Sequence, residues 1–190
     1  MAGLVSGIVT SMAASACIML AVIVIGRCVD KVRNFVMTRP SGEAGRRRAR
    51  FAVDRLCFPG VLVHECAHAL FAKLSGAKVT KMRCFVLFSK DTLGYVDFVA
   101  TGSPVRRAIQ YCLISCAPVL AGMVLVPCLA ATAFSGDAGL PARGLCAYLA
   151  ASILLHMSMS RADTELYKKG ALLVYPFMTM FAFMVRGLFF

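Results

Sequence analysis

Long apolar runs alternate with short polar segments along this chain, and they predict helices at membrane depth. Gly3–Gly26 and Ala108–Phe134 are each long enough to cross a bilayer, and the second run contains no charged residue. Three further runs follow the same pattern: Phe58–Leu74, which is short for a full span, Leu145–Met159 and Ala171–Phe190. The pattern predicts an α-helical polytopic membrane protein with about five membrane-embedded helices.

The polar segments between these runs have two different characters. Residues 27–56 form a basic linker that Pro40-Ser41-Gly42 interrupts. Residues 78–100 alternate between polar and apolar positions on both sides of turn-forming residues. This alternation predicts a small β-hairpin just after the short apolar run Phe58–Leu74. Because an open strand edge cannot face lipid, we expect this hairpin at the membrane surface or in a protein-lined cavity. Residues 1–190 are expected to form a single membrane-embedded domain.

Composition supports the membrane assignment and changes how the charge is interpreted. Hydrophobic residues make up 59% of the chain and charged residues only 16%, which lies outside the usual range for a soluble domain. The formal net charge is +12, but the basic residues lie between apolar runs, where they mark juxtamembrane segments. We therefore expect the basic linker to contact anionic lipid, and we expect no nucleic-acid partner. The lysines and arginines of the linker and of the hairpin favour opposite membrane orientations, so the orientation stays open.

The nine cysteines do not form a recognisable framework. No CxxC pair occurs, and most of the cysteines lie inside apolar runs. Buried cysteine usually behaves as a small hydrophobic residue, so we interpret them as packing residues and not as disulfide partners.

One motif, His64-Glu65-Cys66-Ala67-His68, carries the chemistry. It has the form HExxH, in which residues four apart stand on the same face of a helix. His64 and His68 can therefore bind one metal ion, and Glu65, about 100° further round, can act on water beside that ion. Cys66 is expected to point away from the ion. The residue types predict zinc, which takes two imidazoles, a third protein ligand and an open position in such sites.

The third ligand has three candidates near the end of the chain. Asp163 is the preferred one, and Glu165 and His156 are the alternatives, with His156 also able to act as a second-shell partner of the aspartate. Asp163 has a purely structural interpretation as well, because Ser160 and Asp163 have the spacing of a capping box at a helix start. Asp91 and Asp97 in the hairpin are weaker candidates.

These features together resemble the site-2 protease type of intramembrane zinc metalloprotease. The resemblance covers roughly residues 57–165 and rests on the stretch Pro59–Leu70, on Gly76-Ala77-Lys78-Val79 and Leu93-Gly94-Tyr95-Val96, and on Ser160-x-x-Asp163. Better-known members carry an Asn-Pro…Asp-Gly stretch in the later helix, and this chain does not. The resemblance implies a metalloprotease core over 57–165, flanked by the helices at 3–26 and 171–190.

The function that follows is hydrolysis of peptide bonds in or near the transmembrane segments of membrane proteins. The resemblance implies that His64, His68 and Asp163 hold Zn²⁺ while Glu65 serves as the general base. It also implies an integral, multi-pass protein, expected in the cell (plasma) membrane, whose hairpin edge pairs with an unwound substrate segment. The alternative is a catalytically inactive metal-binding scaffold that binds transmembrane partners. The residues that bind substrate are not indicated by the sequence.

Overall fold

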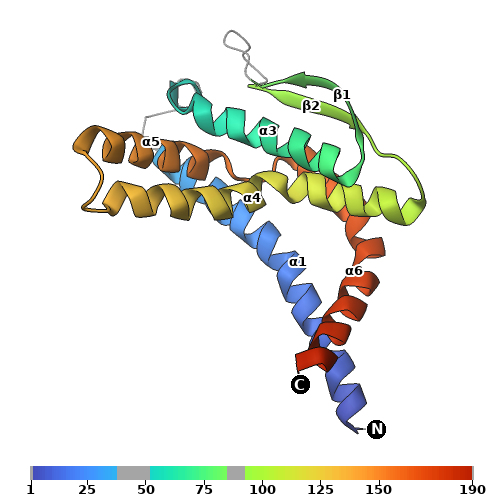
Figure 1. The fold of residues 1–190 in the computed structure, drawn as a ribbon. Coiled ribbons are helices and arrows are strands. Elements are labelled where there is room, and N and C mark those ends of the chain that lie inside the picture. The colour runs from blue at the N-terminus through green and yellow to red at the C-terminus, as the bar shows by residue number, and fades with distance from the viewer. Residues whose placement is uncertain (1, 38–51, 85–92, 190) are drawn as a thin grey trace.

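The computed structural model describes residues 2–37, 52–84 and 93–189 of the chain. These residues form a mostly helical protein with one two-stranded sheet (Figure 1). The elements are α1 (Ala2–Met37), α3 (Phe58–Ser75), β1 (Lys78–Arg83), β2 (Tyr95–Val99), α4 (Pro104–Phe134), α5 (Leu140–His156) and α6 (Arg161–Phe189). A further short helical segment covers residues 52–56.

Three helices in the described part of the chain are long and apolar enough to cross a membrane. They are Val5–Arg33 within α1, Pro104–Phe134 and Arg161–Arg186 within α6. The expectation of about five embedded helices is supported for these three only. α5 is apolar but, at 17 residues, is shorter than a candidate span. α3 has 18 residues but carries an ionisable motif at its centre. Large apolar side chains are exposed along the three candidate spans, as expected for lipid-facing surfaces.

Two helices are longer than the apolar pattern indicates. α1 continues through the start of the basic linker to Met37, because no helix breaker occurs before Pro40 and Asp30 pairs with Arg33 at 2.9 Å one turn later. α6 begins at Arg161, ten residues before the predicted apolar run, because Ser160 caps it. Most of the basic linker, residues 38–51, lies outside the described residues.

α4 is the central element, since it contacts α3, α5 and α6, while α1 packs mainly along α6 (Figure 1). α3 also crosses α5 very closely at Gly60. A Cβ atom there would overlap the carbonyl oxygen of Ser152, and the amide of Gly60 donates to the Ser152 hydroxyl at 2.8 Å. This contact fixes the start of α3 against the body of α5.

The predicted hairpin is confirmed as an antiparallel pair, with Lys78 opposite Val99 and Arg83 opposite Tyr95. The segment between the strands, residues 85–92, lies outside the described part, and it includes Asp91. The buried amide of Gln110 on α4 fixes the base of the hairpin. Gln110 accepts from the Thr101 amide at 2.8 Å and donates to the carbonyl of Ser75 at 3.0 Å, which ties the ends of β2 and α3 to α4.

Candidate metal centre

The HExxH motif lies at the middle of α3, as the sequence predicts. α3 starts with Pro59 in its first turn and ends at Gly76, whose left-handed conformation (φ 80°) allows its amide to bond the carbonyls of the last turn. His64 and His68 stand one turn apart on the same face. Their ring centroids are 4.7 Å apart in an edge-to-face arrangement, and their Nε2 atoms are 3.1 Å apart.

The ring of His64 is oriented by the end of α5. Its Nδ1 lies 2.7 Å from the carbonyl oxygen of His156. His156 is the last residue of α5, where carbonyl groups have no amide partner one turn further along the helix. The helix end therefore supplies the acceptor that holds His64.

The ring of His68 is oriented by α4 in the same way. Its Nδ1 lies 2.7 Å from the carbonyl oxygen of Ile114, in the middle of a 31-residue helix. A mid-helix carbonyl normally accepts from the amide four residues later, but that residue here is Pro118, which has no N–H. Pro118 thus leaves the Ile114 carbonyl free to accept from His68.

These two contacts settle the tautomer of both rings. A carbonyl oxygen can only accept, so each neutral ring carries its proton on Nδ1 and presents a lone pair at Nε2. Burial, followed by the charge of neighbouring His68, lowers the pKa of His64 to about 4, so this ring is neutral near pH 7. Neutral imidazole is the form that binds a metal ion.

Asp163, at the start of α6, completes the cluster. Its Oδ1 lies 3.5 Å from Nε2 of His68, and the three candidate ligand atoms of His64, His68 and Asp163 all lie within 4.8 Å of one another. The other carboxylate oxygen, Oδ2, accepts from the Ser160 amide at 2.9 Å, and the Ser160 hydroxyl accepts from the Asp163 amide at 3.1 Å. The capping box and the ligand position are therefore compatible, because each uses a different oxygen of the same carboxylate.

The donor set suits zinc. Two imidazole nitrogens and one carboxylate oxygen are the ligands of many catalytic zinc sites. Tetrahedral zinc with bonds of about 2.0–2.1 Å keeps its ligand atoms roughly 3.3 Å apart. Two of the three separations, 3.1 and 3.5 Å, lie on either side of that value, and the third, between His64 and Asp163, is within 4.8 Å. Three lone-pair donors that converge in this way are stabilised by a cation held between them.

Glu65 lies beside the cluster and is covered by the end of the hairpin where β1 finishes and β2 begins. Its side chain is buried, and a Cβ atom on Gly94 would lie 2.7 Å from Cγ of Glu65 and 2.9 Å from the carbonyl oxygens of Arg83 and Cys84. Only a glycine fits the chain so closely over the glutamate. Burial, followed by the charge of Asp163, raises the pKa of Glu65 to about 7, a value suited to general acid–base work near neutral pH.

The alternative ligands point elsewhere. The ring of His156 is turned toward Asp54, with Nε2 3.4 Å from Oδ1, and its Nδ1 lies 2.9 Å from the carbonyl oxygen of Ser152. His156 thus reaches the cluster through its backbone and not through its side chain. Glu165 is exposed and pairs with Lys168 at 2.7 Å. The structure brings neither side chain into the cluster with His64, His68 and Asp163.

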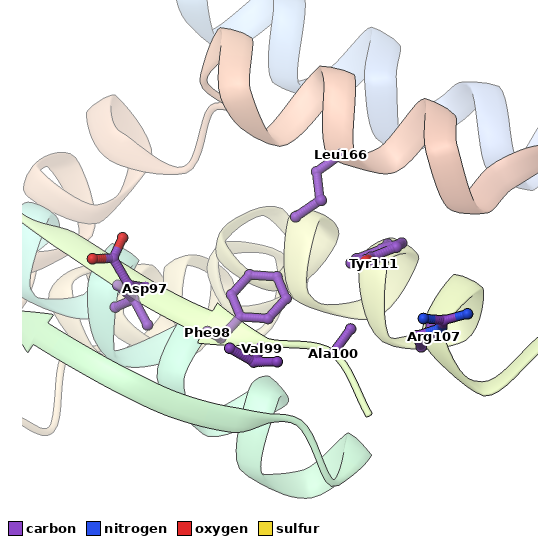
Figure 2. Close-up of a pocket in the computed structure, with 8 residues that line it drawn as sticks. Asp97, Phe98, Val99, Ala100, Arg107, Tyr111 and Leu166 are labelled. Carbon is purple, nitrogen blue, oxygen red and sulfur yellow. The ribbon is translucent and has the colours of Figure 1, made fainter. Parts of the chain in front are cut away.

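An open cleft of ≈ 560 Å³ runs along β2, between the hairpin, α4 and α6. Figure 2 shows Phe98 of β2 and Leu166 of α6 pointing toward one another across it, with Tyr111 of α4 beside them. Leu166 follows Asp163 by three residues on α6. Tyr111 likewise precedes Ile114 by three residues on α4. The cleft and the site, with its supporting Ile114 carbonyl, therefore draw residues from the same two helices, and none of His64, His68 and Asp163 lines the cleft. Asp97 lines this cleft and is not part of the cluster.

Sequence reasoning missed three contributors to this site. Ile114 and the His156 carbonyl hold the imidazoles, and Pro118 frees the first of these acceptors. Pro118 could have been identified from the sequence, because a proline inside a helix has no N–H and leaves the carbonyl four residues before it without its helical partner. The partner of that carbonyl depends on how α3 packs against α4, which no local pattern reveals.

Comparison with known proteins adds no relative: the chain matches no family model, no curated protein and no solved structure.

Proposed function

We propose that this protein is a zinc-dependent intramembrane endopeptidase that cleaves peptide bonds in or near transmembrane segments of membrane proteins. The observation that carries the proposal is the convergence of His64, His68 and Asp163, with both imidazoles held by backbone carbonyls so that Nε2 faces the carboxylate. A metal-ligating histidine almost always donates its other ring N–H to a carbonyl or carboxylate oxygen, as both rings do here. The protein is proposed to be a multi-pass protein of the cell membrane.

The proposed roles follow from position. Zinc, when bound by these three side chains, supplies a Lewis acid that polarises the scissile carbonyl and activates water. Glu65 takes the proton of the attacking water on its carboxylate and returns it to the leaving amine. The Ser160 amide holds one oxygen of Asp163, which leaves the other oxygen directed at the histidines.

The cleft along β2 is the proposed route for substrate. Among the described residues β2 pairs only with β1, along one edge, so we expect its other edge to pair with an extended segment. A transmembrane helix hides its carbonyls in internal hydrogen bonds and must unwind before cleavage. Phe98, Tyr111 and Leu166 offer apolar and aromatic contacts to the side chains of an unwound segment.

The test uses protein in lipid nanodiscs and, as a probe, a tagged single-span polypeptide with an Asn-Gly pair at the centre of its helix. The parent protein is expected to contain one zinc per chain and to cleave the probe. Glu65→Gln is expected to keep zinc and lose cleavage, because the amide cannot accept the proton. The matched control is Glu165→Gln, which alters an exposed glutamate paired with Lys168 and should change neither property.

Two outcomes would reject the proposal. Unchanged cleavage by Glu65→Gln would show that this glutamate is not the base. A parent protein that binds zinc and leaves every such probe intact would instead favour the alternative, a metal-binding scaffold for transmembrane partners.

A further inference from the structure

Arg107 of α4 places a positive charge at one end of the cleft along β2. It lines the cleft beside Ala100, while Asp97 lies toward the opposite end (Figure 2). Arg107 is exposed, and in the parts of the chain that the structure describes no carboxylate pairs with it. A cation without a partner at the end of a cleft can bind an acidic group of whatever occupies that cleft.

Asp97 does not neutralise this charge. It stands opposite Lys81 in the register of the hairpin, on the other face of β2 from Phe98, because successive strand residues point to opposite faces. Residues directly opposite one another on paired strands are close neighbours, so Lys81 is the basic residue that faces Asp97. The cleft therefore keeps the positive charge of Arg107.

The position of Arg107 on α4 indicates where in a membrane this charge lies. α4 is a candidate span, and no charged residue follows Arg107 up to the end of the helix at Phe134. We therefore expect Arg107 at the level of the lipid headgroups, with Tyr111 one turn further into the apolar part of the cleft. A membrane segment that enters the cleft would place the end of its apolar run at Arg107.

The length of β2 sets a spacing between this charge and the proposed general base. Gly94 lies directly over the Glu65 side chain at the start of β2. Ala100 follows the last residue of β2 and lies beside Arg107. A segment paired along the free edge of β2 has one residue opposite each strand residue. Gly94 and Ala100 are six positions apart, so the residue that meets Arg107 lies about six positions from the peptide bond at the glutamate.

We propose that Arg107 selects membrane segments that carry an aspartate or glutamate about six positions from the bond at Glu65, where their apolar run ends. Segments with lysine or arginine at that position are rejected by charge repulsion. Basic residues are common beside membrane spans, so this repulsion excludes many competing segments. The word cleavage applies here only if the proposed function holds, whereas the preference for an acidic segment is a property of binding.

The test measures binding by photocross-linking in nanodiscs, using the zinc-loaded Glu65→Gln protein so that the probe stays uncut. The probe is a single-span polypeptide with an Asn-Gly pair six positions from one end of its apolar run and a benzophenone side chain beside the pair. That end carries glutamate, glutamine or lysine. Two sets of probes are made, with the charged end on the N-terminal or on the C-terminal side of the pair, because the direction of pairing is set by the experiment.

In one of the two sets, the glutamate probe should cross-link about threefold to fivefold more than the glutamine probe, and the lysine probe less by a similar factor. The factor is modest because the ion pair is exposed to water, and high salt should reduce it. Arg107→Gln should make the three probes equal, and Arg107→Glu should reverse their order. The matched control is Arg106→Gln, which should keep the parent order because Arg106 lies over Gly76 and Gly102 and does not line the cleft.

The outcomes separate this inference from the proposed function. Equal cross-linking of the three probes in both sets, no cross-linking at all, or a charge preference that persists in Arg107→Gln would overturn the role of Arg107. The expected order of cross-linking, together with a parent protein that cuts none of the probes, would retain the acidic-segment preference and reject the protease function.

Discussion

Replacing Pro118 with alanine tests how α4 contributes to the proposed metal site. The Ile114 carbonyl accepts from Nδ1 of His68 at 2.7 Å, and Pro118 cannot compete for it because it has no N–H. Pro118→Ala restores an amide at the position that normally bonds this carbonyl. The restored helical hydrogen bond should turn the carbonyl toward the helix axis and away from the imidazole.

Pro118→Ala should weaken zinc binding but stabilise the metal-free fold. Loss of the group that accepts the second ring N–H of a ligating histidine typically costs about 10–100-fold in metal affinity. A carbonyl has two lone pairs and can partly serve both donors, so we expect the lower end, about tenfold or ~1.4 kcal/mol. The metal-free protein should gain stability instead. Removing a helix-interior proline is worth up to about 3 kcal/mol, and the loss of two buried methylenes costs about 1.6 kcal/mol, which leaves a gain of about 1 kcal/mol.

Zinc affinity, measured by competition with a chromophoric chelator, and thermal unfolding of the metal-free protein provide the two readouts. Pro127→Ala is the matched control, because Pro127 interrupts the same helix nine residues further along, where it is exposed. That variant should gain helix stability and bind zinc as the parent does. If Pro118→Ala also binds zinc as the parent does, or if both variants weaken zinc equally, the role assigned to the Ile114 carbonyl is wrong.

Two further predictions concern the other side of the cluster. In a zinc titration, Asp163→Ala should bind zinc at least about 100-fold more weakly than the parent, whereas Glu165→Ala should bind it with unchanged affinity. In thermal unfolding, Ser160→Ala should lose about 1 kcal/mol of stability because the helix cap is lost. Unchanged zinc affinity in Asp163→Ala would remove this carboxylate from the ligand set. Asp54→Asn should weaken zinc binding several-fold without altering the ligands, because Asp54 faces the ring of His156 and helps fix the helix end whose carbonyl holds His64; an unchanged zinc dissociation constant would show that this contact has no positioning role.

The sequence predicted the parts of the site that local spacing controls. Residues four apart share a helix face in any packing, so His64 and His68 had to face together. The Ser160–Asp163 spacing predicted a capping box, and the box is present. The two interpretations of Asp163 turned out not to compete, because a carboxylate has two oxygens and the cap uses one.

The sequence could not predict the features that depend on how helices cross. The limits of α1 and α6 exceed their apolar runs, because helices continue through polar residues until a breaker or a cap intervenes. The sequence also could not predict that the His156 ring points toward Asp54. His156 lies seven residues before Asp163, a spacing that puts two residues on one face of a continuous helix, but α5 ends at His156 and a new helix starts at Arg161.

The use of backbone carbonyls to hold both imidazoles follows from the composition of the chain. Metal-ligating histidines commonly donate their second N–H to a carboxylate, but this chain has only nine acidic residues among 190, and each buried carboxylate is costly in an apolar setting. A backbone carbonyl carries no net charge and is present at every residue, so the requirement reduces to releasing one from its helical partner. The chain does this once with a helix end at His156 and once with a proline at position 118. On this reasoning, prolines four residues after a carbonyl that faces a histidine-bearing helix mark metal sites that a search for acidic partners would overlook.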